Sequence, residues 1–221
     1  MSVYKVLNEE ELPAGWEIRL LSEIAGFRLG KTPARQNKKY WDTEELEWVT
    51  ISDMKEYSNV EFTKEKISKK ALNETFRGNL SPKGTLIMSF KLTIGRTSIL
   101  GVDAVHNEAI ISIFPDENII LRDYLLFYLP QIDYEKYQDT AVKGSTLNKT
   151  KLSNLEIAFP TKINEQKKIV NLMSNLNLLE NIFKGNQNDA LKILRELIDD
   201  GLDARIFLND ILELIYLFMR R

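Results

Sequence analysis

The fold of this chain is decided by the stretch Gly144–Pro160, which reads GSTLNKTKLSNLEIAFP. The sequence before it is mixed and strand-rich, whereas the sequence after it is nearly all helical. Leu152, Leu155, Ile157 and Phe159 supply apolar anchors for a last strand that ends at Pro160. The stretch therefore predicts an α+β fold, in which a mixed, strand-rich domain closes here and a helical region follows.

Composition narrows the classes of function. The chain has 221 residues, 43% of them hydrophobic, which is enough for one full domain with an appendage or for two small domains. With no cysteine, a disulfide framework, a thiol nucleophile and a Cys-ligated zinc site are excluded. The single histidine, His106, argues against a His-based metal site or a Ser-His-Asp triad. The formal net charge of -2 predicts no partner by itself, so a nucleic-acid site would need its cations gathered on one face.

Segment patterns predict three regions: a leader over residues 1–12, a domain over 13–160 and a helical region over 161–221. The leader is polar and acidic, unlike a signal peptide, and no apolar run reaches the ~20 residues that span a bilayer. We therefore expect a cytoplasmic protein with no membrane partner. Within the domain, alternating or apolar runs predict strands at Trp16–Leu20, Glu47–Ile51, Val60–Ile67, Leu86–Phe90 and Ile110–Phe114. Helices are expected after Ser68 and within Ile119–Ile132.

A basic segment, Gly26–Lys39, reads as an irregular loop that ends in aromatic residues. Such a loop suits contacts with phosphates and bases, and its candidate DNA-binding residues are Arg28, Lys31, Arg35, Asn37, Lys38, Lys39 and Tyr40. The alternative is a solvated loop that Tyr40 and Trp41 anchor to the core, and this is the commoner case for a charged loop.

Two later segments add polar and basic candidates. Lys91, Thr93 and Arg96 surround Gly95, although Arg96 also fits an ordinary surface strand position. The closing stretch contributes short polar and basic side chains that suit phosphates and base edges: Lys143, Ser145, Thr146, Asn148, Lys149 and Lys151. We predict that Lys31, Arg35, Lys143 and Lys149 share one DNA-facing surface. His106 is expected to be a hydrogen-bonded structural residue.

The region after Asn164 has the spacing of a coiled coil. Eight of ten a and d positions between Ile169 and Asp200 are apolar, and the candidate seam for self-association comprises Ile169, Leu172, Leu176, Leu179, Phe183, Ile193 and Leu197. Gly185 costs about 1 kcal/mol against Ala within a helix, so the helix can break there. Gly201 is the expected C-cap, and Leu202–Met219 is a further, shorter helix whose apolar faces need a partner.

No catalytic motif stands out in the sequence. There is no phosphate-binding P-loop, no Asn-Pro-Pro-Tyr or Asp-Pro-Pro-Tyr methyltransferase tetrapeptide and no metal-ligand cluster. From the residues alone, the chain reads as a binding module with a coiled-coil appendage.

In addition, a series of short motifs resembles the specificity subunit of type I restriction-modification systems, in a form with a single target-recognition domain. The motifs follow in the family's order: Pro13–Glu17, Gly30–Pro33 with Tyr40-Trp41, Trp48–Asp53, Lys66–Ser68, Pro82–Ser89, Thr93–Gly95, Asn107–Ala109, Gly144–Thr146, Ile157–Pro160 and Glu165–Val170. Each is weak alone, but together they cover most of residues 13–180.

This resemblance implies a non-catalytic domain that reads a few base pairs of double-stranded DNA, followed by a spacer helix. The implied partners are methyltransferase subunits, which use S-adenosylmethionine, and a restriction subunit, which uses ATP and Mg²⁺; this chain itself is expected to carry no cofactor. Usual members have two recognition domains and two spacers, so this chain is a half-subunit by resemblance, and a pair of copies would read a symmetric, interrupted target.

Two stretches depart from the family pattern. Asn107-Glu108-Ala109 stands where the family often has Asn-Gln-Ala, and Asp199–Arg221 does not follow the usual end of the spacer.

Two alternative functions stay open. One is a detached recognition domain of a fused restriction-methyltransferase, and the other is a coiled-coil oligomerisation protein without DNA binding. Salt-dependent affinity for duplex DNA separates the specificity subunit from the last of these.

Overall fold

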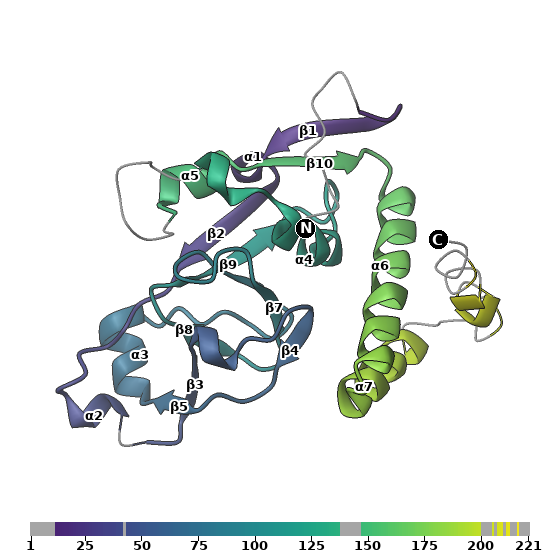
Figure 1. Ribbon diagram of the computed structural model, residues 1–221. Coiled ribbons are helices and arrows are strands. Elements are labelled where there is room, and N and C mark those ends of the chain that lie inside the picture. The colour runs from purple at the N-terminus through teal and green to yellow at the C-terminus, as the bar shows by residue number, and fades with distance from the viewer. Residues whose placement is uncertain are drawn as a thin grey trace. The chain divides into compact units, whose positions relative to one another are not determined.

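The computed structural model describes residues 12–41, 43–137 and 147–199, together with residues 205, 207–209, 211–212 and 216 near the end of the chain. The chain divides into two compact units, Met1–Gln166 and Lys167–Arg221 (Figure 1). The sequence placed this boundary at residue 160. We describe each unit separately.

Three sheets organise the first unit. A five-stranded sheet has the order β2-β9-β6-β7-β4, formed by Ala25–Leu29, Ile110–Pro115, Leu86–Ser89, Thr97–Leu100 and Ser58–Val60. A three-stranded sheet has the order β5-β3-β8, formed by Glu65–Ile67, Leu46–Val49 and Ala104–His106. A two-stranded sheet pairs β1 (Trp16–Leu20) antiparallel with β10 (Glu156–Pro160), so the two ends of the unit close on each other.

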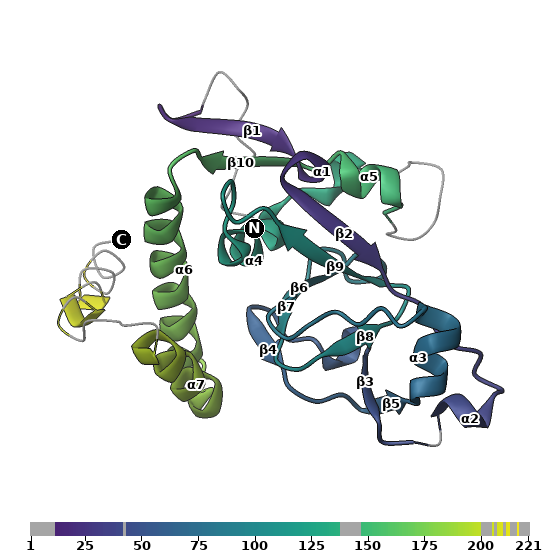
Figure 2. The same cartoon turned by 180° about the vertical axis from the view of Figure 1, so that it is seen from behind.

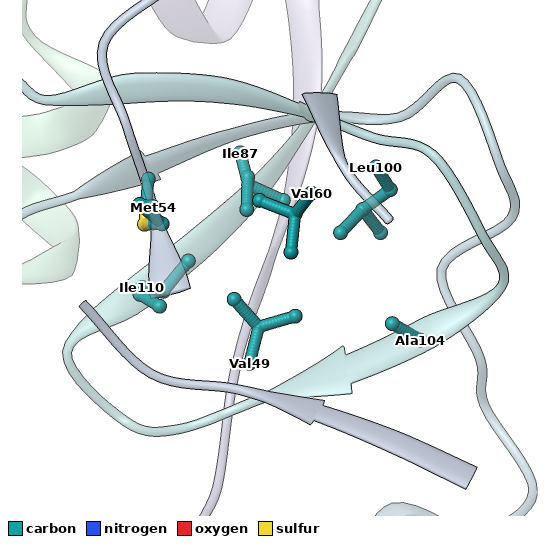
Figure 3. Close-up of a cluster of buried hydrophobic side chains, with 7 residues drawn as sticks. All are labelled: Val49, Met54, Val60, Ile87, Leu100, Ala104 and Ile110. Atoms are coloured by element: carbon teal, nitrogen blue, oxygen red, sulfur yellow. The ribbon is translucent and has the colours of Figure 1, made fainter. Parts of the chain in front are cut away.

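The main core lies between the five-stranded and the three-stranded sheets (Figure 3). Val49 of β3 and Ala104 of β8 meet side chains from four strands of the larger sheet: Val60, Ile87, Leu100 and Ile110. Because successive strand residues point to opposite faces, their neighbours Trp48 and Val105 point the other way. There they pack with α3 (Lys69–Phe76), which begins at the N-cap Ser68. The small sheet is thus covered on both faces.

The short helices of this unit are α1 (Leu21–Ile24), α2 (Lys38–Trp41), α4 (Arg122–Tyr128) and α5 (Lys149–Ser153). Single 3-10 turns occupy Ile51–Asp53, Leu129–Gln131 and Tyr134–Tyr137.

Most predicted strands and helices are confirmed, with three corrections. Ala25–Leu29 is a strand, because it pairs with β9, so the basic loop starts later than predicted. Val60–Ile67 is not one strand but the end of β4 and then β5. Leu152, predicted as an anchor of the last strand, lies in the helix Lys149–Ser153 instead.

One buried amide fixes the start of the long helix α6 (Ile163–Phe183). The Gln166 side chain is fully buried and makes three hydrogen bonds. Its Oε1 accepts from the Leu121 N–H at 2.9 Å, and its Nε2 donates to the carbonyls of Ile119 (2.8 Å) and Pro160 (2.9 Å). A buried amide that is satisfied in this way holds three chain segments in one geometry.

The second unit contains α7 (Gln187–Asp199) and most of α6. With 21 residues, α6 is about 30 Å long. The break expected at Gly185 is confirmed: this residue has a φ of +73° between the two helices. The seam residues therefore lie on two helices, with Ile193 and Leu197 on α7. Gly201 lies outside the described residues, and those described beyond it are helical. None of the described helices has both the length and the apolar character needed to cross a membrane.

Candidate nucleic-acid interface

The basic loop after β2 is fixed against the turn between β8 and β9. The N–H of Gly30 donates to the carbonyl of Ile110 at 3.1 Å, and that of Lys31 donates to the carbonyl of His106 at 2.9 Å. A Cβ on Gly30 would lie only 2.0 Å from the carbonyl oxygen of Asn107, so glycine is required for this close approach. The loop that carries Lys31 and Arg35 is therefore held in place at its start.

Glu108, in this turn, lies at the centre of a charged cluster. It accepts a hydrogen bond from the Thr32 hydroxyl. This hydrogen bond first, and then the positive charges of Lys91 and Arg35, hold the pKa of the Glu108 carboxyl below its usual value. The cluster therefore brings the basic loop and the segment after β6 together around one carboxylate.

The stretch that closes the domain reaches the same place. The N–H of Phe90 donates to the carbonyl of Ala109 at 2.9 Å, and the N–H of Leu147 donates to the carbonyl of Phe90 at 3.1 Å. Asn148 then caps α5, because its Oδ1 accepts from the Lys151 N–H at 2.9 Å. Lys149, in the first turn of α5, is exposed. Three segments far apart in the sequence are thus joined by backbone hydrogen bonds.

We call this joined set the basic cluster and define it as Lys31, Thr32, Arg35, Lys91, Glu108 and Lys149. It draws on all three segments that carry the predicted DNA-binding residues. The joined segments carry four basic side chains, which suits a polyanion. The Lys31 ammonium also donates to the carbonyl of Thr75 at 3.1 Å. Of the other predicted residues in the closing stretch, Lys143, Ser145 and Thr146 lie outside the described residues.

Several predicted residues are occupied with structural contacts. The Arg35 guanidinium forms an ion pair with Glu65 and lies 3.9 Å above the Trp41 ring, although its side chain is 51% exposed. Arg28 Nη1 donates to the carbonyl of Leu80 at 2.9 Å, and Arg96 Nη1 donates to that of Ile51 at 3.4 Å. For Arg28 and Arg96 these contacts favour a role in tying strands and turns together.

The aromatic end of the loop serves as an anchor, the alternative that the sequence left open. Trp41 packs edge-on against Trp48 at 4.9 Å between ring centroids. Both Tyr40 and Trp41 cover the core cluster that Trp48 and Val105 form with α3. The Tyr40 hydroxyl bonds to Glu74, and this hydrogen bond raises the pKa of the phenol. The Asn37 side chain is used locally as well, since its Oδ1 accepts from the Lys39 N–H at 3.2 Å.

Lys38 and Lys39 are exposed on α2, which lies at the opposite end of the unit from α5 in both views (Figure 2). The structure does not bring them together with Lys149 and Lys151. Thr93 is exposed, and its carbonyl accepts a hydrogen bond from the buried Ser89 hydroxyl.

His106 is a structural residue, as predicted. Its Nε2 lies 2.7 Å from the Ser112 hydroxyl, and burial lowers its pKa to about 4. The Ser112 hydroxyl in turn lies 2.6 Å from that of Ser81, so the imidazole belongs to a buried polar chain between strands. Among the described residues, no group of three or more His, Cys, Asp or Glu side chains could hold a metal ion.

Comparison with known proteins identifies the family. The family model of the type I restriction modification DNA specificity domain matches residues 13–192. The chain belongs to this family. A second model, for domain III of the DNA polymerase III subunits gamma and tau, matches residues 170–221, which lie within the second unit.

Two curated relatives of the specificity-domain family are similar over most of this chain. The type I restriction enzyme MjaIX specificity subunit of Methanocaldococcus jannaschii is 27% identical over 96% of this chain and 49% of its own length. The HindI specificity subunit of Haemophilus influenzae is 28% identical over 85% of this chain and 40% of its own length. The chain thus spans half or less of these relatives.

Solved structures share the fold. A chain from a study of complex assembly and conformational transition of the type I R-M system superposes with a TM-score of 0.62 at 20% identity, covering 83% of this chain and 44% of that one. The S subunit of a type I restriction-modification system from M. genitalium gives 0.53 at 15% identity, covering 89% and 46%. These likenesses confirm the predicted fold class, a strand-rich domain followed by a long helix.

Sequence reasoning missed two residues that build this site, Thr32 and Glu108, and one that fixes the start of α6, Gln166. Thr32 and Glu108 were within motifs that carried the family resemblance, yet their mutual contact joins positions 76 apart in the sequence. Gln166 was part of the helix-start motif, but its buried hydrogen bonds to Leu121 and Ile119 are long-range.

Proposed function

We propose that this chain is the non-catalytic DNA-reading specificity subunit of a type I restriction-modification complex, in half-subunit form. The observation that carries the proposal is the basic cluster, in which backbone hydrogen bonds join the segments of Lys31 and Arg35, of Lys91 and of Lys149 with the β8–β9 turn that carries Glu108. Cations on loops suit phosphate contacts, and short polar side chains beside them suit base edges.

The partners in this proposal are double-stranded DNA and the methyltransferase and restriction subunits of the same system. The chemistry belongs to those subunits, so S-adenosylmethionine, ATP and Mg²⁺ would bind there and not to this chain. The chain would act in the cytoplasm, where its DNA is, and would contribute position and sequence choice.

Self-association through the C-terminal helices completes the proposal. The chain covers 49% of the MjaIX subunit and 40% of the HindI subunit, so two copies would restore the length of one such subunit. The exposed apolar side chains Leu172 and Phe183 on α6 support a helical contact between copies, since such side chains gain from burial. A two-fold pair would read a symmetric, interrupted sequence.

Selection from a random duplex library tests the DNA-binding proposal. The full chain should recover one sequence family, with an affinity for it that falls as salt rises, because phosphate contacts release counterions. Lys149→Glu, in the basic cluster, should weaken binding at least about tenfold. Lys38→Glu, with the same charge change on α2, is the matched control and should change binding less than about twofold.

Two results would contradict this proposal. One is that the selection recovers no sequence family, which would favour an oligomerisation protein. The other is equal loss from Lys149→Glu and Lys38→Glu, which would move the interface away from the basic cluster.

A further inference from the structure

Leu92 is an apolar side chain held out into solvent next to the basic cluster. It is 85% exposed and has a φ of +64°, a left-handed conformation that disfavours leucine. It directly follows Lys91, whose ammonium group lies 5.6 Å above the Phe90 ring. A side chain that is both exposed and in a disfavoured backbone conformation is unlike an ordinary solvated loop residue.

The loop under Leu92 is fixed at both ends. On one side Phe90 is buried and is held through its N–H by Ala109 and through its carbonyl by Leu147. On the other side the Gly95 N–H donates to the carbonyl of Ser89 at 2.9 Å. A Cβ on Gly95 would lie 2.5 Å from Cε2 of the buried Tyr134, so this glycine lets the loop fit tightly against the core. The backbone of Leu92 is therefore set by its surroundings, and its side chain is presented from a rigid base.

The turn that carries Leu92 bears on which groove of DNA this side chain could enter. Leu92 lies between β6 and β7, an antiparallel pair with Met88 opposite Thr97, and both are interior strands of the five-stranded sheet, so the turn and not the strands would reach the DNA. The major groove, about 12 Å wide, leaves more room for such a turn than the minor groove, about 6 Å wide. In the major groove the exposed apolar group of a base is the thymine 5-methyl.

We propose that Leu92 is a specificity-determining residue that contacts a thymine 5-methyl in the major groove, while Lys91 beside it faces the phosphates. This inference rests on the proposed DNA-binding function and adds a base contact to it. An apolar contact with the thymine methyl carries sequence information, which a lysine on phosphate does not.

Phe62 provides the contrast within the same unit. It is 76% exposed in the loop between β4 and β5. Its neighbours are Glu61 and Thr63, and Thr63 is held by the Glu47 carboxylate through its N–H (2.8 Å) and its hydroxyl (2.6 Å). The carboxylates of Glu47 and Glu61 lie at this loop and it is not part of the basic cluster, so Phe62 serves as a control.

The test compares full-length variants on the duplex that the wild-type chain selects from a random library, and on a mixed-sequence duplex of equal length. Leu92→Asn keeps the left-handed backbone accessible, because asparagine tolerates it, but removes the apolar group. It should lower affinity for the selected duplex about tenfold and leave affinity for the mixed duplex and the salt dependence unchanged. Leu92→Met and Phe62→Asn should each stay within about twofold of wild type.

Uracil replacement identifies the atom that is contacted. Each thymine of the selected duplex is changed in turn to uracil, which lacks the 5-methyl. At one position the wild-type chain should lose about fourfold in affinity, the worth of one buried methyl, and the Leu92→Asn chain should lose nothing further there.

Three results would overturn the inference. They are unchanged affinity of Leu92→Asn for the selected duplex, an equal loss on both duplexes, and a uracil effect that persists in Leu92→Asn at every sensitive position. If the wild-type chain selects no sequence at all, the proposed function fails instead, so the two failures are distinguishable.

Discussion

The two units of this protein treat their apolar side chains differently. Among the described residues of Met1–Gln166, the large apolar side chains that are exposed are Leu29, Phe62 and Leu92. Among the fewer described residues of Lys167–Arg221 they are Leu172, Ile182, Phe183, Leu191, Ile198, Leu208, Leu212 and Tyr216. The first unit buries its apolar surface within itself, whereas the second exposes much of it.

This difference separates two kinds of stability. The first unit is held by sheet pairing and by close fits such as that of Gly30 against the β8–β9 turn. Helices gain most of their stability from packing an apolar face, so α6 and α7 gain from a partner in a way that the first unit does not. A second copy of the chain is the partner that we propose.

Gly30→Ala tests the close fit in the first unit and has the largest expected effect. The new Cβ would meet the carbonyl oxygens of Asn107 and His106 at 2.0 and 2.2 Å, so the loop or the turn must move. We expect the free energy of unfolding to fall by about 4 kcal/mol. Chemical denaturation followed by tryptophan fluorescence measures this unit selectively, because Trp16, Trp41 and Trp48 all lie in it.

Gly26→Ala is the matched control for this substitution. Gly26 lies in β2, four residues before Gly30, and the nearest atom to its added Cβ is 4.0 Å away. Its free energy of unfolding should change by less than about 0.5 kcal/mol. Equal effects of the two substitutions would contradict the close fit.

Gln166→Leu tests whether the first unit extends into the start of α6. The substitution leaves the half-buried Leu121 N–H without its acceptor and the Ile119 and Pro160 carbonyls without this donor. We expect a loss of about 3 kcal/mol in the free energy of unfolding of the first unit. Glu165→Gln removes only an exposed ion pair with Lys162, 3.9 Å between Nζ and Oε1, and should have almost no effect. If the Gln166→Leu chain were as stable as wild type, the boundary between the two units would lie before α6.

The pH dependence tests the buried polar chain around His106. Burial lowers the pKa of His106 from 6.5 to about 4, so between these values the unfolded chain binds more protons than the folded one. The stability that the buried, neutral His106 contributes is fully present above pH 6.5 and is lost as the pH falls towards 4. We expect wild type to lose about 2 kcal/mol more than His106→Asn between pH 7 and pH 5 in denaturation measurements. Parallel losses in the two chains would show that His106 is not held neutral by burial.

Leu172→Asp tests the second unit and should hardly affect unfolding of the first. Leu172 is 46% exposed on α6, so its replacement costs the isolated chain less than about 0.5 kcal/mol. In the proposed pair of copies it places a charge in an apolar contact, and sedimentation should change from dimer to monomer. Asn171→Asp, the same charge one residue earlier, is the control. A Leu172→Asp chain that sediments like wild type would remove α6 from the contact between copies.

The fold could be predicted where the signal is local. The alternation of apolar and polar residues in Trp16–Leu20 and the apolar run in Leu86–Phe90 predicted strands. Ser68 predicted a helix start, and Gly185 predicted the break between α6 and α7. The sequence did not show that Arg28 lies in a strand, because a basic strand next to Gly and Lys reads as a loop until its partner β9 is known.

The candidate site was less predictable because its contacts are long-range. The basic segments could be identified from composition, but their meeting depends on backbone hydrogen bonds that join Gly30 to Ile110 and Phe90 to Leu147. The contact between Thr32 and Glu108 joins two motifs in the same way. Leu92 was not a candidate at all, since an apolar residue between Lys91 and Thr93 gives no hint of its exposure or its left-handed backbone.

Mapping of genome methylation tests the central claim most directly, namely that this chain chooses the DNA sequence on which its complex acts. Cells that carry the methyltransferase and restriction subunits are compared with and without the gene for this chain, and with the Lys149→Glu variant in its place. We predict that methylation at one interrupted sequence disappears without the gene and is reduced in the variant, while other methylated sequences stay unchanged. Methylation that is identical in all three cell lines would contradict the account.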